Sequence, residues 1–255
     1  MIMSGIVLLT GATGHLGREI LQGLVPDWSV ICIARRPVDL TLIDPSLRDR
    51  VISLEVDIRS DSLEQIINIV EEVLDRKSLK LSGLVNNAYY LDVVSHDDVS
   101  VGACDSALRG LFSFHVALTL GIMKRGLFHY LSSVVNISSM YAKVAPNPSV
   151  YPQNIPINPL LYGSMKAALC QSTRYLSSIL APDGVRVNSV SYGPFPSLEV
   201  QESSPVFVSK LASNTHLGRI GLPEESAGVI KFLLSSDSSY VTGADISVDG
   251  GWTAW

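Results

Sequence analysis

The chain has 255 residues, of which 47% are hydrophobic and 17% charged, and its formal net charge is -5. This length and composition suit a chain that buries a substantial core, which excludes an intrinsically disordered protein. The charge is small and no long run of like charges occurs, so a nucleic-acid or anionic-membrane surface is not expected. A small-molecule partner is favoured.

The three cysteines, Cys32, Cys104 and Cys170, lie far apart and form neither a CxxC pair nor a metal-ligand pattern. We interpret them as buried thiols in a reducing compartment. The N-terminus has no basic start or cleavage site typical of a signal peptide, and the apolar stretches are short for a membrane span. The sequence therefore predicts a cytoplasmic protein outside the membrane.

Apolar and β-branched runs predict seven strands along the chain. They lie at residues 6–9, 30–34, 51–56, 83–86, 134–137, 186–190 and 245–248. Helical periodicity lies between them, from the end of a glycine loop to Leu24 and then at residues 62–76, 103–125, 160–180 and 224–235. This alternation predicts one doubly wound, Rossmann-type α/β domain over residues 1–255, with a mainly parallel seven-stranded sheet.

Two proline-rich stretches, 145–160 and 193–205, follow strands of this predicted sheet. Open α/β sheets bind ligands at the carboxyl ends of their strands. We therefore interpret both stretches as ligand loops and not as linkers between domains.

The glycine loop Thr10 to Gly17 reads TGATGHLG and joins the first strand to the first helix. Glycines there permit a tight turn and a close approach of the backbone to a pyrophosphate, which the helix N-terminal amides then face. The residues expected at the nucleotide are Gly11, Thr13, Gly14, His15, Leu16 and Gly17. The alternative is an ordinary glycine-rich turn.

The second strand ends in Ile33-Ala34-Arg35-Arg36, with no carboxylate to bind a ribose 2′-hydroxyl. Guanidinium groups at this place accept a 2′-phosphate and cannot be deprotonated. Arg35 and Arg36 therefore predict NADP rather than NAD. A solvated surface pair of arginines is the alternative.

Tyr162 and Lys166 stand four residues apart in the helix predicted at 160–180, so their side chains share one helical face. The spacing alone is a weak signal. Asn136-Ile137-Ser138-Ser139 strengthens it, because this run places hydroxyl groups at the carboxyl end of a strand, beside the expected ligand crevice.

With these motifs the chain resembles a short-chain dehydrogenase/reductase over essentially its whole length. The motifs stand in the family's order: Thr10 to Gly17, Asp57-Ile58, Asn86-Asn87-Ala88, Asn136 to Ser139, Tyr162 to Lys166, Gly193-Pro194 and Val248 to Gly251. The compact branch of about 250 residues fits best, although the loop has the TGxxGxxG spacing of the longer branch.

The resemblance implies that Tyr162 is the general acid or base and that Lys166 holds the nicotinamide ribose and lowers the pKa of the tyrosine. Ser139 would donate a hydrogen bond to the substrate oxygen. The resemblance also implies that Asp57 and Ile58 hold the adenine. It places Asn87, Ala88, Gly193 and Pro194 at the cofactor.

Three departures from the family's pattern stand out. Tyr89 follows Ala88 where the family's NNAG motif ends in glycine, and Ala107 replaces an asparagine that usually positions a water for proton relay to the lysine. The stretch from Met140 to Leu161 is also longer than usual. It carries Tyr141, Lys143, Tyr151, Gln153 and Asn154, a polar set suited to a hydroxylated substrate.

This insertion is similar to those of members that act in bacterial surface-sugar biosynthesis, so a sugar or polyol derivative is one expected substrate. A surface loop that packs on its own aromatic residues is the alternative. Apolar faces on the helices at 103–125 and 160–180 match the surfaces by which relatives associate, which predicts a homotetramer or homodimer. Trp252 and Trp255 are expected to pack against the protein or a neighbouring subunit.

His96, His115, His129 and His216 show no ligand spacing, so no metal site is predicted. Two hypotheses remain. The chain is an oxidoreductase that moves hydride between NADP(H) and a carbonyl or secondary alcohol, or it is a nucleotide-binding sensor or scaffold of the same fold that has lost catalysis, as Tyr89 and Ala107 suggest.

Overall fold

The computed structural model of the chain describes residues 5–92 and 100–255. Seven strands form one sheet in the order β3-β2-β1-β4-β5-β6-β7, and every neighbouring pair is parallel. The strands are β1 (Ile6–Thr10), β2 (Ser29–Ala34), β3 (Val51–Glu55), β4 (Leu81–Asn86), β5 (Phe128–Ser139), β6 (Arg186–Tyr192) and β7 (Asp245–Val248). The predicted doubly wound α/β fold is confirmed.

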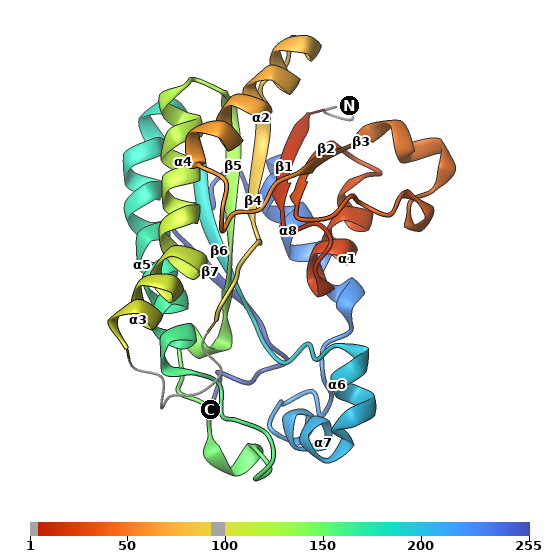
Figure 1. Cartoon of the computed structure of the whole chain (residues 1–255), viewed down its shortest axis with the longest axis vertical. Coiled ribbons are helices and arrows are strands. Elements are labelled where there is room, and N and C mark those ends of the chain that lie inside the picture. The colour runs from red at the N-terminus through yellow and green to blue at the C-terminus, as the bar shows by residue number, and fades with distance from the viewer. Residues whose placement is uncertain (1–4, 93–99) are drawn as a thin grey trace.

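Helices cover both faces of the sheet (Figure 1). They are α1 (His15–Leu24), α2 (Leu63–Lys77), α3 (Val101–Leu108), α4 (Phe114–Lys124), α5 (Leu160–Leu180), α6 (Leu198–Ser203), α7 (Pro205–Ser213) and α8 (Ser226–Leu234). Helices α1 and α8 pack together on one face, while α2, α4 and α5 lie on the other.

Strand β1 shows why the sheet is buried on both sides. Ile6 and Leu8 join the apolar cluster beneath α2, α4 and α5, whereas Val7 and Leu9 join the cluster beneath α1 and α8. Successive side chains of a strand point to opposite faces, so a strand covered on both faces is apolar at every position. The continuous apolar run in the sequence is the local signature of this arrangement.

The helix predicted at 103–125 is continuous in direction but not in hydrogen bonding. Helix α3 ends at Leu108, a π-helical turn covers Arg109–Ser113, and α4 follows. Gly110 lies in this turn, where a Cβ atom would stand 2.3 Å from the carbonyl oxygen of Tyr90. Glycine at this position thus lets the helix pass close to the segment that follows β4.

By length and composition alone, the helical stretch Val101–Lys124 reaches what a membrane span requires, contrary to the expectation that the apolar stretches are too short. Its residues Leu111, Leu118 and Ile122 are fully buried inside the protein. A core helix of a globular protein meets the same criteria, so this stretch is weak support for a membrane span.

The loop expected after β6 contains two short helices, α6 and α7. Ser197 caps α6 by accepting a hydrogen bond from the backbone amide of Val200, and Pro205 stands in the first turn of α7. Proline at a first helical position is favourable, because its missing amide proton has no helical partner there. The prolines of this stretch therefore mark helix starts as well as loop.

Candidate active site

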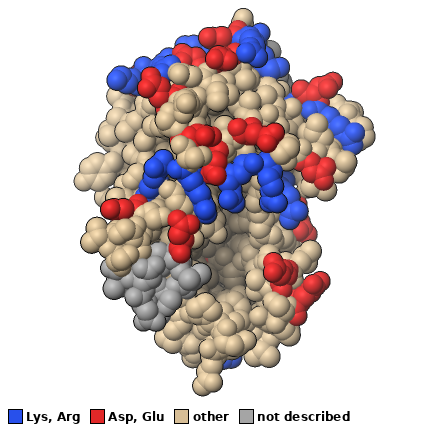
Figure 2. Space-filling model, viewed as in Figure 1, with Lys and Arg blue, Asp and Glu red and all other residues tan. Residues whose placement is uncertain are grey.

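A cleft of about 460 Å³ opens at the carboxyl ends of β1, β2, β4, β5 and β6. Figure 2 shows a hollow in the middle of this face, with Lys and Arg side chains along its rim. The cleft brings together Gly11, Thr13, Gly14, His15, Leu16, Gly17, Arg35, Arg36, Asp57, Ile58, Asn87, Ala88, Ser139, Tyr162, Lys166 and Gly193. Pro194 instead lines a neighbouring pocket of about 100 Å³.

The glycine loop forms a tight turn before the uncapped start of α1. Gly11 has a φ of +73°, a conformation that glycine adopts at little cost, and its amide donates to Ile33 O over 2.7 Å. A Cβ atom on Gly17 would lie 2.0 Å from the carbonyl oxygen of Gly11. Gly14 precedes α1 and no side chain caps this helix, so its first amides are free to face an anion.

Thr10, at the end of β1, joins the loop to β4. Its hydroxyl donates to Val85 O over 3.3 Å and accepts from the amides of Asn87, at 3.0 Å, and Ala88, at 2.9 Å. The Asn87 amide group in turn donates to the carbonyls of Thr10 and Gly11. Asn87 and Ala88 therefore hold the glycine loop in place as well as lining the cleft.

Arg35 and Arg36 follow the last residue of β2, and both are exposed at the cleft. In the part of the chain that the structure describes, neither guanidinium has a hydrogen bond or an ion pair. Arg59 differs, because it pairs with Asp92 at 3.4 Å and lies over the ring of Tyr90 at 5.0 Å. Within the described residues, Arg35 and Arg36 are thus two cations at the cleft that are available to bind an anion.

The turn after β3 places Asp57 and Ile58 in the lining of the cleft. The Asp57 carboxylate accepts from the amide of Arg59 over 3.0 Å, and the Asp57 amide donates to Asp61 over 2.8 Å. Ile58 is buried in the core and also lines the cleft. These contacts give the turn a defined shape within the described residues.

Tyr162, Lys166 and Ser139 meet in the cleft, as the sequence predicted. Lys166 is 2% exposed and donates to Ile137 O over 2.8 Å, and burial lowers its pKa to about 8. Burial also raises the pKa of the Tyr162 phenol above its usual value, and a hydrogen bond with Ser139 partly offsets this. The Ser139 hydroxyl accepts from the amide of Tyr141 over 3.2 Å.

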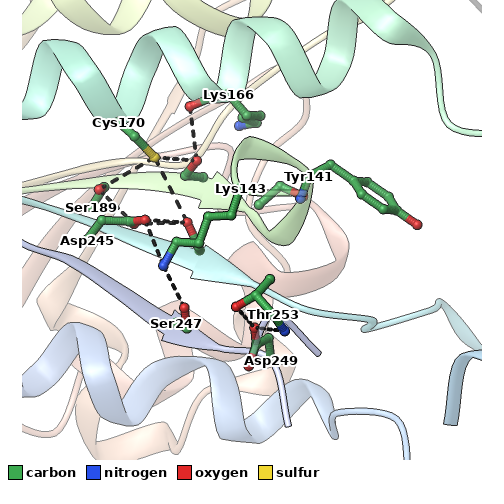
Figure 3. A network of polar contacts seen from close by, with 12 residues as sticks. Tyr141, Lys143, Lys166, Cys170, Ser189, Asp245, Ser247, Asp249 and Thr253 are labelled. Atoms are coloured by element: carbon green, nitrogen blue, oxygen red, sulfur yellow. Dashed lines mark hydrogen bonds and ion pairs between the residues drawn. The ribbon is translucent and has the colours of Figure 1, made fainter. Parts of the chain in front are cut away.

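Three polar residues of the insertion, Tyr141, Lys143 and Tyr151, have partners inside the protein. The hydroxyls of Tyr141 and Tyr151 bond to each other over 2.5 Å. Figure 3 shows Lys143 reaching from the end of β5 towards β7, where its ammonium lies 3.0 Å from Asp245 and 2.6 Å from the hydroxyl of Ser247. None of the insertion's polar side chains lines the cleft, neither these three nor Gln153 and Asn154.

Some residues of the cleft were not predicted from the sequence. They are Ile33, Ala34, Val56, Arg59, Tyr90, Ile137, Ser138, Tyr192 and Phe195. Most stand at or just beyond the carboxyl end of a strand, which is the one signal that could have identified them. Tyr89, noted as a departure, lies at the cleft with its ring 6.1 Å from that of Tyr162.

Among residues 5–92 and 100–255, no three His, Cys, Asp or Glu side chains are grouped as metal ligands. His96 lies outside the described residues. His115 is 1% exposed, and neither ring nitrogen has a hydrogen-bond partner within the described structure. Trp252 is buried, whereas Trp255 is exposed and contacts the ring of His216.

Comparison with known proteins identifies the family. A family model described as Enoyl-(Acyl carrier protein) reductase matches residues 39–253. The chain belongs to the short-chain dehydrogenase/reductase family. Protein FixR of Bradyrhizobium diazoefficiens is 30% identical over 96% of this chain and 86% of its own length. An uncharacterized short-chain type dehydrogenase/reductase, y4vI of Sinorhizobium fredii, is 28% identical over 97% of this chain, which spans only 43% of that protein.

Several solved structures have the same fold as this chain. A short-chain dehydrogenase from Leptospira borgpetersenii with bound NAD+ is 25% identical and superposes with a TM-score of 0.82, covering 98% of this chain and 93% of its own. The actinorhodin polyketide ketoreductase with NADPH is 22% identical, with a TM-score of 0.80 over 100% of this chain and 99% of its own. The fold of this chain is thus shared with proteins solved with bound NAD+ or NADPH.

Proposed function

We propose that the chain, taken as one domain over residues 1–255, is an NADP-dependent oxidoreductase that interconverts a secondary alcohol and a carbonyl compound. The observation that carries this proposal is the meeting of Tyr162, Lys166 and Ser139 in one cleft with the glycine loop. A hydroxyl and a phenol, with a buried ammonium beside them, suit proton transfer to a carbonyl oxygen.

The residues of the cleft fit a nicotinamide dinucleotide with a 2′-phosphate. Gly11 and Gly17 let the loop fold tightly beneath the nucleotide, because a Cβ atom on either would collide with the protein's own atoms. The first amides of α1 have no side-chain cap and can face a phosphate. The exposed pair Arg35 and Arg36 suits a 2′-phosphate, because guanidiniums bind phosphate oxygens in pairs and keep their charge. When bound, the nucleotide supplies or accepts the hydride.

The protein's own residues would handle the proton and the oxygen. In carbonyl reduction, Tyr162 gives its phenolic proton to the oxygen that gains charge, and Ser139 donates a hydrogen bond to the same oxygen. A positive charge on Lys166 would favour the ionised form of the tyrosine and so make it a stronger acid. This would act in the same direction as the hydrogen bond with Ser139, which lowers the pKa that burial raises. Alcohol oxidation uses the same groups in reverse.

We leave the substrate class at carbonyls and secondary alcohols. A sugar or polyol derivative belongs in the assay panel, although the hydroxyls of Tyr141 and Tyr151 bond to each other rather than facing the cleft. The small net charge fits a small-molecule substrate rather than a nucleic acid.

We also propose a homotetramer or homodimer in the cytoplasm. Helix α5 exposes Tyr175 and Ile179, and α4 exposes Leu120. Apolar side chains on neighbouring helices form a surface that a second copy of the chain would bury, and closed symmetry would leave none of it in water.

The test of the proposed function measures nucleotide binding and turnover separately. We expect NADPH to bind more tightly than NADH, and Arg36→Ala to weaken NADPH binding by about tenfold, a loss typical of a charged hydrogen bond, without affecting NADH. Arg76→Ala, at an exposed ion pair of α2, is the matched control.

Tyr162→Phe should abolish reduction of every compound in a panel of carbonyl substrates. Retained turnover in Tyr162→Phe would refute the catalytic assignment, and NADPH binding without any turnover would favour the sensor hypothesis.

A further inference from the structure

The ammonium of Lys166 is buried without a counter-ion. Its side chain is 2% exposed and its one hydrogen bond within the described structure runs to Ile137 O. No carboxylate of the described residues forms an ion pair with it. Burying a charge is costly unless other groups stabilise it, so the surroundings of this ammonium decide how much of it stays charged.

Two aromatic rings lie within range of a cation–π interaction. The Lys166 ammonium is 5.4 Å from the ring centroid of Tyr89 and 5.8 Å from that of Tyr162. The face of an aromatic ring is electron-rich and attracts a cation within about 6 Å, more strongly where water is excluded. Because Tyr162 takes part in the proton transfer, Tyr89 is the ring near Lys166 that has no part in the chemical step proposed above.

The backbone sets the position of Tyr89. The amides of Asn87 and Ala88 both donate to Thr10, which fixes the start of this segment at the end of β4. The Tyr89 ring lines the cleft, is 57% exposed and meets the ring of Tyr162 edge to face at 64°. A glycine at this place would leave the lysine without an aromatic neighbour on that side.

We propose that Tyr89 is a positioning residue for Lys166: its ring keeps the buried ammonium charged and beside Tyr162. This inference rests on the proposed oxidoreductase function and adds to it a role for a side chain that departs from the family's pattern. The role belongs to the ring and not to the hydroxyl, which has no hydrogen-bond partner among the described residues.

The other titratable groups around Lys166 do not supply a negative charge that would keep its ammonium charged. They are Tyr162 and Cys170 on α5 and His115 on α4. None is a carboxylate, and the pKa of His115 is lowered to about 3 by burial and by the charge of Lys166, so the imidazole is neutral at working pH. With a pKa of about 8, Lys166 is close to half charged under mildly alkaline conditions. A modest stabilisation of the cation therefore changes its population.

The test compares Tyr89→Leu, which keeps an apolar side chain of useful size, with Tyr89→Phe, which keeps the ring. A cation–π interaction of this kind changes the ratio of charged to neutral lysine by about tenfold, or roughly one pH unit. We expect the alkaline limb of the turnover profile to move down by that amount in Tyr89→Leu and to stay in place in Tyr89→Phe. An unmoved limb in Tyr89→Leu, or equal shifts in both variants, would overturn the proposal.

A second readout needs neither nucleotide nor turnover. Because burial lowers the pKa of Lys166 below its unfolded value, the contribution of this lysine to stability rises with pH above the folded pKa. Tyr89→Leu should start that rise at lower pH, and the difference should vanish when both proteins also carry Lys166→Met. If the difference persists there, Tyr89 acts elsewhere. If turnover is never found but this shift is, the proposed function fails and the inference about Tyr89 stands.

Discussion

Lowering the pH should destabilise this protein through one buried histidine. His115 lies in the first turn of α4, is 1% exposed, and has no hydrogen-bond partner on either ring nitrogen within the described structure. Burial and then the charge of Lys166 lower its pKa to about 3. The imidazole is therefore neutral in the folded protein across the whole range in which an exposed histidine takes up a proton.

The size of the effect follows from the two pKa values. In the unfolded chain the histidine titrates near 6.5, so between pH 6.5 and pH 3 the unfolded state binds more protons than the folded state. Stability then falls as the pH is lowered through this window. Between pH 7.5 and pH 5 the unfolded state gains about 2 kcal/mol, since each unit below pH 6.5 adds about 1.4 kcal/mol.

Urea unfolding at pH 7.5 and pH 5 measures this term by comparing the wild type with His115→Leu. Other groups also titrate, so the expected result is a difference: the loss of stability on acidification should be about 2 kcal/mol smaller in His115→Leu. His129→Leu, at an exposed position of β5, is the matched control and should leave the loss unchanged. Equal losses in the wild type and His115→Leu would refute the reasoning.

Other contacts make shorter predictions. Gly17→Ala puts a Cβ atom 2.0 Å from a backbone oxygen of the glycine loop, so NADPH affinity and melting temperature should both fall. Gly102→Ala is the control, since nothing lies within 4 Å of its Cβ atom, and it should change neither quantity by much. Equal changes in the two variants would contradict the role given to Gly17 in the loop. Lys143→Met removes the cation beside Asp245, whose side chain is 10% exposed, so the free energy of unfolding measured in urea should fall by about 1–3 kcal/mol. Adding Asp245→Asn should restore part of this stability. Burial raises the pKa of the Cys32 thiol to about 12, so a thiol reagent should label it only in urea; rapid labelling of the folded protein at Cys32 would contradict its burial.

The local signals in the chain were enough for the fold. The alternate residues of β1 pack into two different clusters, and this requires only that every position of the strand be apolar. The glycine loop and the four-residue spacing of Tyr162 and Lys166 are also local patterns. The structure places both at the same cleft, as expected for the carboxyl ends of a parallel sheet.

Local sequence patterns did not predict features of the secondary structure that depend on residues far apart in the chain. The sequence did not reveal the π-helical turn at Arg109–Ser113, where Gly110 lies against Tyr90 of a separate segment. The prolines of the stretch 193–205 suggested a loop, although Pro205 begins α7. A proline that starts a helix cannot be told from one that ends a helix without its structural context.

The sequence by itself determined the α/β class and the alternation of strands and helices, because hydrophobic periodicity, glycine turns and helical spacing depend on a few neighbouring residues. The residues it predicted for the site stay a prediction, and most of them line one cleft. Only the tertiary structure decided what those side chains meet. Tyr141 pairs with Tyr151, Lys143 with Asp245, and the Tyr89 ring lies against the ammonium of Lys166. Each contact joins residues from separate segments, and such pairings depend on how the whole chain packs rather than on its local pattern.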